Sequence, residues 1–273
     1  LKFSSATISE QINSSEQYHL QLINTAIPDI MMKITEALVQ PNCQVKDLNL
    51  NDNVFIPFSE NGVQTQKEGE AAMTMLAKAL QDPKCSIENI NLRGNTIFKE
   101  GVQQINKVLA NEKCNVKTIK LWENCELKKG EQVQWFAAPS ILGTMNEKEN
   151  NAYIDHLKVI LLDPNVVAVH IESGASSVDV AKELSQILQL PNCNIRYVNF
   201  AMKERDGDQK SCHAARYIAE ALQHPECKIE HLNLQTDVKF TASLTKLIVD
   251  GTAPRNQPSM LAAENVPQQY EYK

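Results

Sequence analysis

The chain has 273 residues, of which 42% are hydrophobic and 5% aromatic, and its formal net charge is −6. A chain of this size can bury a continuous aliphatic core, and its acidic balance excludes the broad basic face that sequence-independent nucleic-acid binding needs. We therefore expect no nucleic-acid partner. No stretch approaches the ~18 apolar residues of a membrane-spanning helix, so we also expect no membrane span.

Seven copies of one short apolar pattern predict seven strands. In each copy two apolar residues stand two positions apart, as they do in a strand with one buried face. Three of the six intervals between the second apolar residues are 28 or 29 residues, as from Leu92 to Leu121 (121 − 92 = 29), which indicates a repeating unit. The other three intervals, of 42, 50 and 34 residues, are that unit with insertions. These second residues are Leu22, Leu50, Leu92, Leu121, Ile171, Phe200 and Leu234, and five copies share a cysteine: Cys43, Cys85, Cys114, Cys193 and Cys227.

A helix is predicted before most of these strands. Ala72, Leu76 and Leu80 stand four apart and so place one apolar stripe on a helix, and Pro83 then ends it. Each unit is therefore predicted to be a helix, a turn, a short strand and a loop, and stacked units supply one another's core. Stripes with the same spacing lie at residues 30–38, 101–109, 180–188 and 214–222.

Two insertions and two terminal segments depart from the repeat. Residues 53–67 contain Phe55 and Phe58, which we expect either to fold back onto the repeats or to offer a contact. Residues 125–150 are a second insertion, within a broken repeat. Further predictions are helices over 131–138, 150–162 and 241–249, an N-terminal cap at 1–16 and a flexible C-terminal tail at 251–273.

The predicted fold is an α/β solenoid. Packed helices need about 10 Å of width and paired strands about 4.8 Å, so a stack of such units must curve. The segments LQDPKCSIENINLRGNTIFKEG (80–101) and LQHPECKIEHLNL (222–234) resemble ribonuclease-inhibitor-type leucine-rich repeats. The resemblance covers residues 17–250 and implies a horseshoe, with parallel strands on the concave face and helices on the convex face.

The cysteines and histidines carry no sign of a metal site or of a disulfide framework. One cysteine per repeat predicts a small buried core group, and such a row of thiols fits a reducing, cytoplasmic compartment. Phosphate-binding and serine-hydrolase motifs are absent, and the histidines lack the spacing of metal ligands. We therefore expect a protein that is not an enzyme, with no metal, no cofactor and no small-molecule ligand.

Strand alternation selects the side chains that would line the concave face. Trp122 follows the buried Leu121 directly, so it cannot share that residue's face, although it could instead pack laterally on residues 125–150. Tryptophan, tyrosine and arginine often dominate contacts between proteins. The candidate partner-binding residues are Arg93, Lys120, Trp122, His170, Glu172, Tyr197 and His231.

These observations predict a protein-protein interaction module that binds another protein through its concave face. Among leucine-rich-repeat proteins, the irregular units and the Asn/Gln/Lys-rich surface look most like effectors of intracellular bacteria. That likeness implies secretion into the host cytosol, a host protein as partner and a role in virulence. Two alternatives stay open: a GTPase-activating or GTPase-regulating protein, for which Arg93 is the one concave arginine near a repeat loop, and an actin-capping, tropomodulin-like protein.

Overall fold

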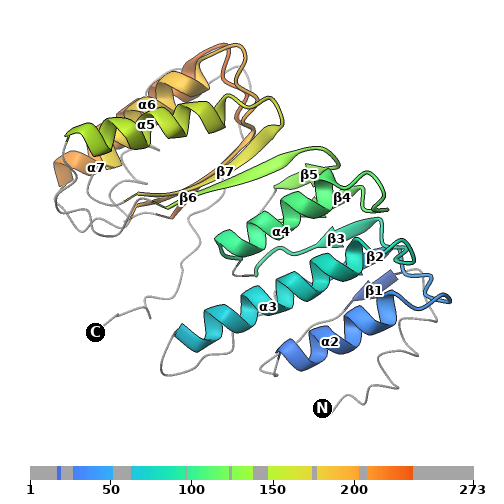
Figure 1. The fold of residues 1–273 in the computed structure, drawn as a ribbon. Coiled ribbons are helices and arrows are strands. Elements are labelled where there is room, and N and C mark those ends of the chain that lie inside the picture. The colour runs from blue at the N-terminus through green and yellow to red at the C-terminus, as the bar shows by residue number, and fades with distance from the viewer. Residues whose placement is uncertain are drawn as a thin grey trace. The chain divides into compact units, whose positions relative to one another are not determined.

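The computed structural model describes residues 17–19, 27–51, 63–95, 97–122, 125–137, 147–173, 177–202 and 208–235. Over these residues the chain is an α/β protein with two sheets built largely from parallel strands, each accompanied by helices (Figure 1). The chain divides into two compact units, which we call unit 1 (Leu1–Val133) and unit 2 (Gln134–Lys273). Each is described by itself.

Strands and helices alternate along unit 1. The elements are β1 (Gln17–His19), α2 (Ile27–Leu38), β2 (Asp47–Asn49), α3 (Val63–Leu80), β3 (Asn89–Asn91), α4 (Lys99–Ala110), β4 (Thr118–Lys120) and β5 (Glu126–Lys128). The strands form sheet A, in the order β1-β2-β3-β4-β5. Neighbours from β1 to β4 are parallel, whereas β5 pairs antiparallel with β4. Helices α2, α3 and α4 lie side by side next to the sheet (Figure 1).

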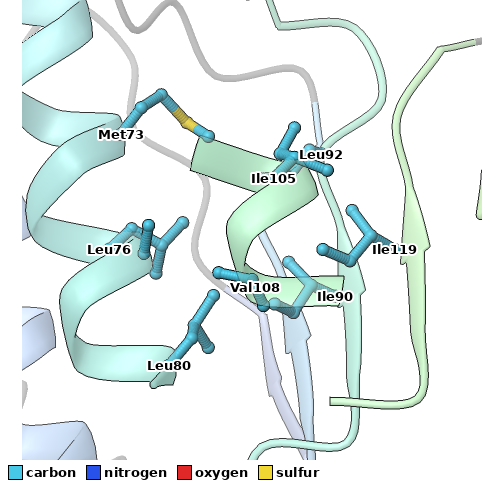
Figure 2. A pocket seen from close by; sticks show the side chains of 9 residues that line it. Met73, Leu76, Leu80, Ile90, Leu92, Ile105, Val108 and Ile119 are labelled. Carbon is cyan, nitrogen blue, oxygen red and sulfur yellow. The ribbon is translucent and has the colours of Figure 1, made fainter. Parts of the chain in front are cut away.

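The core of unit 1 lies between α3, α4 and one face of sheet A. Figure 2 shows side chains of these elements pointing toward one another around a cavity of about 10 Å³, room for about one water molecule. The middle residues of β3 and β4 reach this core, so the first and third residues of each strand point away from the helices. The lining is Met73, Leu76, Ala77, Leu80, Ile90, Leu92, Ile105, Val108 and Ile119.

Hydrogen bonds from one repeat to the preceding one reinforce unit 1. The Ser86 hydroxyl donates to the carbonyl oxygens of Cys43 and Val45, at 3.1 and 2.9 Å. The Asn115 side chain donates to the carbonyl oxygen of Cys85 at 2.8 Å. Both donors directly follow the cysteine of their repeat, so one position in each repeat supplies this link.

Unit 2 has the same alternation around a second sheet. Its elements are β6 (Gln132–Ala137), α5 (Glu147–Leu161), β7 (Val166–Ser173), α6 (Ser177–Leu188), β8 (Tyr197–Met202), α7 (Asp208–Gln223) and β9 (His231–Gln235), with β6 starting just before the boundary between units. Sheet B has the order β6-β7-β8-β9, and β7, β8 and β9 are parallel. Its core packs Val169, Ile171 and Phe200 against Leu184 of α6 and Ile218 of α7.

The structure corrects the prediction of one continuous ladder of strands. The apolar pairs at 48/50, 90/92 and 119/121 are consecutive in sheet A, whereas those at 169/171, 198/200 and 232/234 are consecutive in sheet B. The break falls in residues 125–150. There β5 turns back against β4 and occupies the edge on which the next parallel strand would have added.

Residues 131–138, predicted to be a helix, contain strand β6 instead. Val133, Trp135 and Phe136 are β-branched or aromatic, and such side chains favour strands. The side chain of Asn106 in α4 holds the extended backbone of Val133 in two directions. Its Nδ2 donates to the carbonyl oxygen at 2.7 Å, and its Oδ1 accepts from the N–H at 3.0 Å. An extended residue needs such outside partners because it lacks those of a helix.

Two smaller predictions also need correction. The insertion predicted at 53–67 ends earlier, because α3 begins at Val63. In the first repeat the register pairs Tyr18 with Leu48, where the sequence pattern had placed Leu20.

The helical stripes at 30–38, 101–109, 180–188 and 214–222 are confirmed, as is a helix covering most of 150–162. The N-terminal cap at 1–16, the closing helix at 241–249, the tail at 251–273 and the two phenylalanines Phe55 and Phe58 lie outside the described residues.

Candidate functional site

One face of sheet A is turned away from the helices, and its side chains are partly exposed. In β2, β3 and β4 the middle residue is buried while the residues on either side are half-buried. The parallel register aligns these outer residues in two rows. This confirms the predicted alternation in unit 1 and defines the helix-free face of sheet A. The first row is Asp47, Asn89 and Thr118, and the second is Asn49, Asn91 and Lys120.

The first row is closed by hydrogen bonds within itself. The Nδ2 of Asn89 donates to Oδ1 of Asp47 at 2.7 Å, and the hydroxyl of Thr118 donates to Oδ1 of Asn89 at 2.8 Å. The Asp47 carboxylate therefore already has a donor on the neighbouring strand. This row ties three strands together at the surface.

The second row shapes the ends of the strands. The Oδ1 of Asn49 accepts from the N–H of Asn51 at 3.1 Å, and the Oδ1 of Asn91 accepts from the N–H of Arg93 at 3.2 Å. Such bonds to the backbone two residues ahead are characteristic of asparagine in turns. Gly94 follows with a φ of 67°, a left-handed conformation that glycine adopts readily. Arg93 is therefore fixed at the start of a tight turn.

Arg93, Lys120 and Trp122 lie at neighbouring strand ends, and we call them the Arg93 corner. All three are half-buried, and Lys120 stands opposite Asn91 in the register. The carbonyl oxygen of Trp122 accepts from the N–H of Cys125 at 3.1 Å, which holds the turn into β5. The Nε of Arg93 is buried and has no hydrogen-bond partner among the described residues.

Cations at the other end of the same strands are paired. Glu88, just before β3, forms ion pairs with Lys46 at 3.2 Å and with Lys117. The hydrogen bonds from Lys117 and then Lys46 lower the pKa of Glu88 below its ordinary value. Three successive repeats thus share one carboxylate.

On sheet B, the face opposite Val169, Ile171 and Phe200 carries paired aromatic rings. The ring centroids of Trp135 and His170 lie 3.8 Å apart, with an angle of 30° between the ring planes. The ring centroids of Tyr197 and His231 lie 5.5 Å apart, and the two rings are nearly parallel, with an interplanar angle of 5°. The Arg196 guanidinium carbon lies 5.3 Å from the centre of the Tyr197 ring, a cation–π distance. His170 and Tyr197 are only 4% and 7% exposed.

The predicted contact residues therefore fall on two separate sheets. Arg93, Lys120 and Trp122 lie on sheet A, whereas His170, Glu172, Tyr197 and His231 belong to sheet B. Glu172 pairs with Ala201 in the register, and its side chain lies outside the described part of the structure. The expectation that one ladder of strands carries all seven residues is wrong.

Sequence reasoning also missed two members of these surfaces, Trp135 and Arg196. Trp135 was assigned to a helix, although the alternation of Gln132, Val133 and Gln134 would have indicated a strand. Arg196 lies directly before β8, and strand alternation places its position with the buried Val198 and Phe200, so it was not considered for the outer face.

The repeated cysteines are placed in the core, as predicted. Those of the first four repeats that carry one are buried, and Cys227 is half-buried; all are free thiols. Burial raises the pKa of Cys85 to about 11 and raises the pKa of Cys114, Cys193 and Cys227 as well. These thiols are therefore protonated near neutral pH and are poor nucleophiles, since the thiolate is the reactive form.

The described ranges hold no group of three or more His, Cys, Asp or Glu side chains arranged to bind a metal ion. Among the helices placed in the structure, none combines the length and apolarity needed to cross a membrane.

No protein-family model matches the chain, and no curated protein shows significant similarity to it. The site is therefore interpreted from its own geometry.

Proposed function

We propose that the chain is a protein-protein interaction module that binds its partner on the helix-free face of sheet A. The observation that carries this proposal is the contrast between the two outer surfaces. On sheet A that face is partly exposed and polar, with Trp122 at its edge, whereas His170 and Tyr197 on sheet B are buried. An accessible polar surface that includes a tryptophan and an arginine is well suited to binding a protein.

We further propose that each unit is a short leucine-rich-repeat solenoid. The resemblance of residues 80–101 and 222–234 to such repeats supports this, as does the parallel pairing of successive strands with helices between them. In two consecutive repeats, the residue after the repeated cysteine, Ser86 or Asn115, donates a hydrogen bond to the preceding repeat, as stacked repeats of a solenoid require. A curved arrangement would leave the strand surface concave and open to a partner.

The proposed partner is a protein of a host cell, and the proposed source is an intracellular bacterium that secretes the chain as a virulence effector. The likeness of the irregular repeats to such effectors supports this. Free cysteines buried in both units fit a reducing cytosol. The GTPase-regulating and actin-capping alternatives rest on the repeat resemblance, with Arg93 as the one residue that the former would use.

Exchange of Trp122 tests the docking surface. The immobilised chain would capture proteins from host-cell lysate, and mass spectrometry would quantify each one bound to wild type, Trp122→Ala and Lys107→Ala. Lys107 is exposed on α4, away from the sheet surface, and so is the control. We expect one or more proteins to be lost by about tenfold or more with Trp122→Ala only, as for an interface hot spot. Equal capture by all three chains would refute the site.

A further inference from the structure

The Arg93 corner contains two cationic side chains, Arg93 and Lys120. Neither Arg93 nor Lys120 forms an ion pair with any residue that the structure describes. We propose that these side chains bind carboxylates of an acidic segment of the partner protein, with an apolar or aromatic residue of that segment against Trp122. This inference rests on the proposed function and specifies the chemistry of the partner.

Some lysines of the repeats are engaged in contacts between neighbouring repeats. Lys46 and Lys117 share Glu88, and Lys129 donates to the carbonyl oxygens of Glu112 and Cys114 at 2.9 and 2.5 Å. Lys228 in unit 2 donates to the carbonyl oxygen of Pro191 and to Oδ1 of Asn194, both at 3.0 Å. These lysines therefore help to join repeats, whereas the side chains of Arg93 and Lys120 form no ion pair with any residue in the described ranges.

Arg93 is also held in place before any partner arrives. Its N–H donates to Asn91, and its carbonyl oxygen accepts from Nδ2 of Asn95 at 3.1 Å. Its Nε is buried and has no hydrogen-bond acceptor among the residues that the structure describes. A guanidinium can donate two parallel hydrogen bonds to one carboxylate, so an incoming carboxylate would satisfy this N–H and neutralise the charge together.

The surroundings favour a short acidic peptide segment over a nucleic acid. Asp47 lies on the same face, and Glu126 stands opposite Lys120 in the β4–β5 register. With a net charge of −6 on the whole chain, these carboxylates would repel a continuous phosphate backbone. One or two carboxylates reaching Arg93 and Lys120 can avoid them, and Trp122 offers the apolar contact that commonly accompanies such charges.

A displayed library of random 16-residue peptides tests this proposal on the full chain. Peptides selected on wild type would be synthesised with a fluorophore and titrated against four chains: wild type, Arg93→Gln/Lys120→Gln, Trp122→Ala, and Lys46→Gln/Lys117→Gln. The last variant removes the same charge from the same unit but at the opposite ends of the strands. Thermal unfolding of each variant would verify that it is folded.

We expect selected peptides to be enriched in Asp and Glu and to lose about tenfold or more in affinity with Arg93→Gln/Lys120→Gln, as loss of charged hydrogen bonds implies. The Lys46→Gln/Lys117→Gln control should stay within about twofold, since exposed paired charges contribute little. Competition by a single-stranded oligonucleotide at equal potency would overturn the acidic-protein assignment.

Two other results separate this proposal from the proposed function. Peptides without acidic enrichment that depend on Trp122 but not on the two cations would leave the docking surface in place and overturn the carboxylate assignment. Peptides that bind all four chains equally would overturn both.

Discussion

The amide of Asn95 lies buried under the turn after β3, and its Nδ2 donates to three carbonyl oxygens. These belong to Leu50 at 2.7 Å, Leu92 at 2.9 Å and Arg93 at 3.1 Å. One acceptor is in the preceding repeat and two are in its own, so a single side chain joins two repeats and shapes the turn. The same amide therefore supports both the stack and the position of Arg93.

Replacement of Asn95 by alanine should destabilise unit 1. Three buried or part-buried carbonyl oxygens would lose a donor, and an unsatisfied buried polar group costs about 1–3 kcal/mol. We expect the free energy of unfolding, measured by urea titration, to fall by about that amount. Asn115→Ala is the matched control, because this exposed side chain donates a hydrogen bond to the preceding repeat, at the carbonyl oxygen of Cys85. A loss no larger than the control's would show that the Asn95 bonds contribute little.

At the scale of elements, the Glu88 ion pairs join strands β2, β3 and β4 at their starts. The pKa of Glu88 is lowered from 4.5 by Lys117 and Lys46. A carboxyl group with a lowered pKa in the folded state stabilises the fold above its unfolded pKa, and this contribution is lost as the pH falls through the folded pKa. The relevant window is therefore acidic, at and below about 4.5.

Glu88→Gln should lower the melting temperature slightly at pH 7, and this difference from wild type should shrink as the pH is lowered to 3. Protonation removes the charge of the wild-type carboxyl group as the pH falls through its folded-state pKa, so the two side chains come to resemble each other. Scanning calorimetry of both chains at the two pH values would measure the difference, and 1 M salt should reduce it at pH 7 because the pairs are exposed. A difference that persists at pH 3 would assign the effect to something other than charge.

Most elements could be predicted from periodicity, and the exception has a physical cause. Helix α4 and strand β3 follow directly from apolar spacings of four and two. Strand β6 was missed because the repeat spacing favoured a helix, whereas its β-branched and aromatic residues and the side chain of Asn106 favour extended backbone. Local propensity therefore decided where the repeat was irregular.

At the scale of the whole molecule, the sequence predicted the six apolar pairs from 48/50 to 232/234 as strands but not the number of ladders that they form. Each apolar pair satisfies the same local rule, whichever strand lies beside it. What divides the rungs is the antiparallel return of β5 onto β4, a choice of partner that no spacing in the sequence encodes. For this reason the half-burial of Lys120 beside the buried Ile119 agrees with the predicted alternation, while the expectation that one ladder carries both Lys120 and Tyr197 is wrong.

Thiols distributed through the cores of both units allow the native state to be probed along the chain. Cys43, Cys85 and Cys114 in unit 1 and Cys193 in unit 2 are buried, whereas Cys227 is half-buried. In the folded chain iodoacetamide should therefore modify Cys227 before these four, because a buried thiol reacts only when its surroundings open. Peptide mapping by mass spectrometry over a time course would give the order.

The same labelling in concentrated urea is the control, and there the five thiols should react at similar rates, since unfolding removes the difference in burial. Faster native labelling of Cys85 than of Cys227 would contradict the packing described for unit 1. If the last repeat opened independently, its half-buried thiol would react first. Labelling of all five thiols at one slow rate in the native chain would therefore mean that the last repeat opens only together with the rest of the chain.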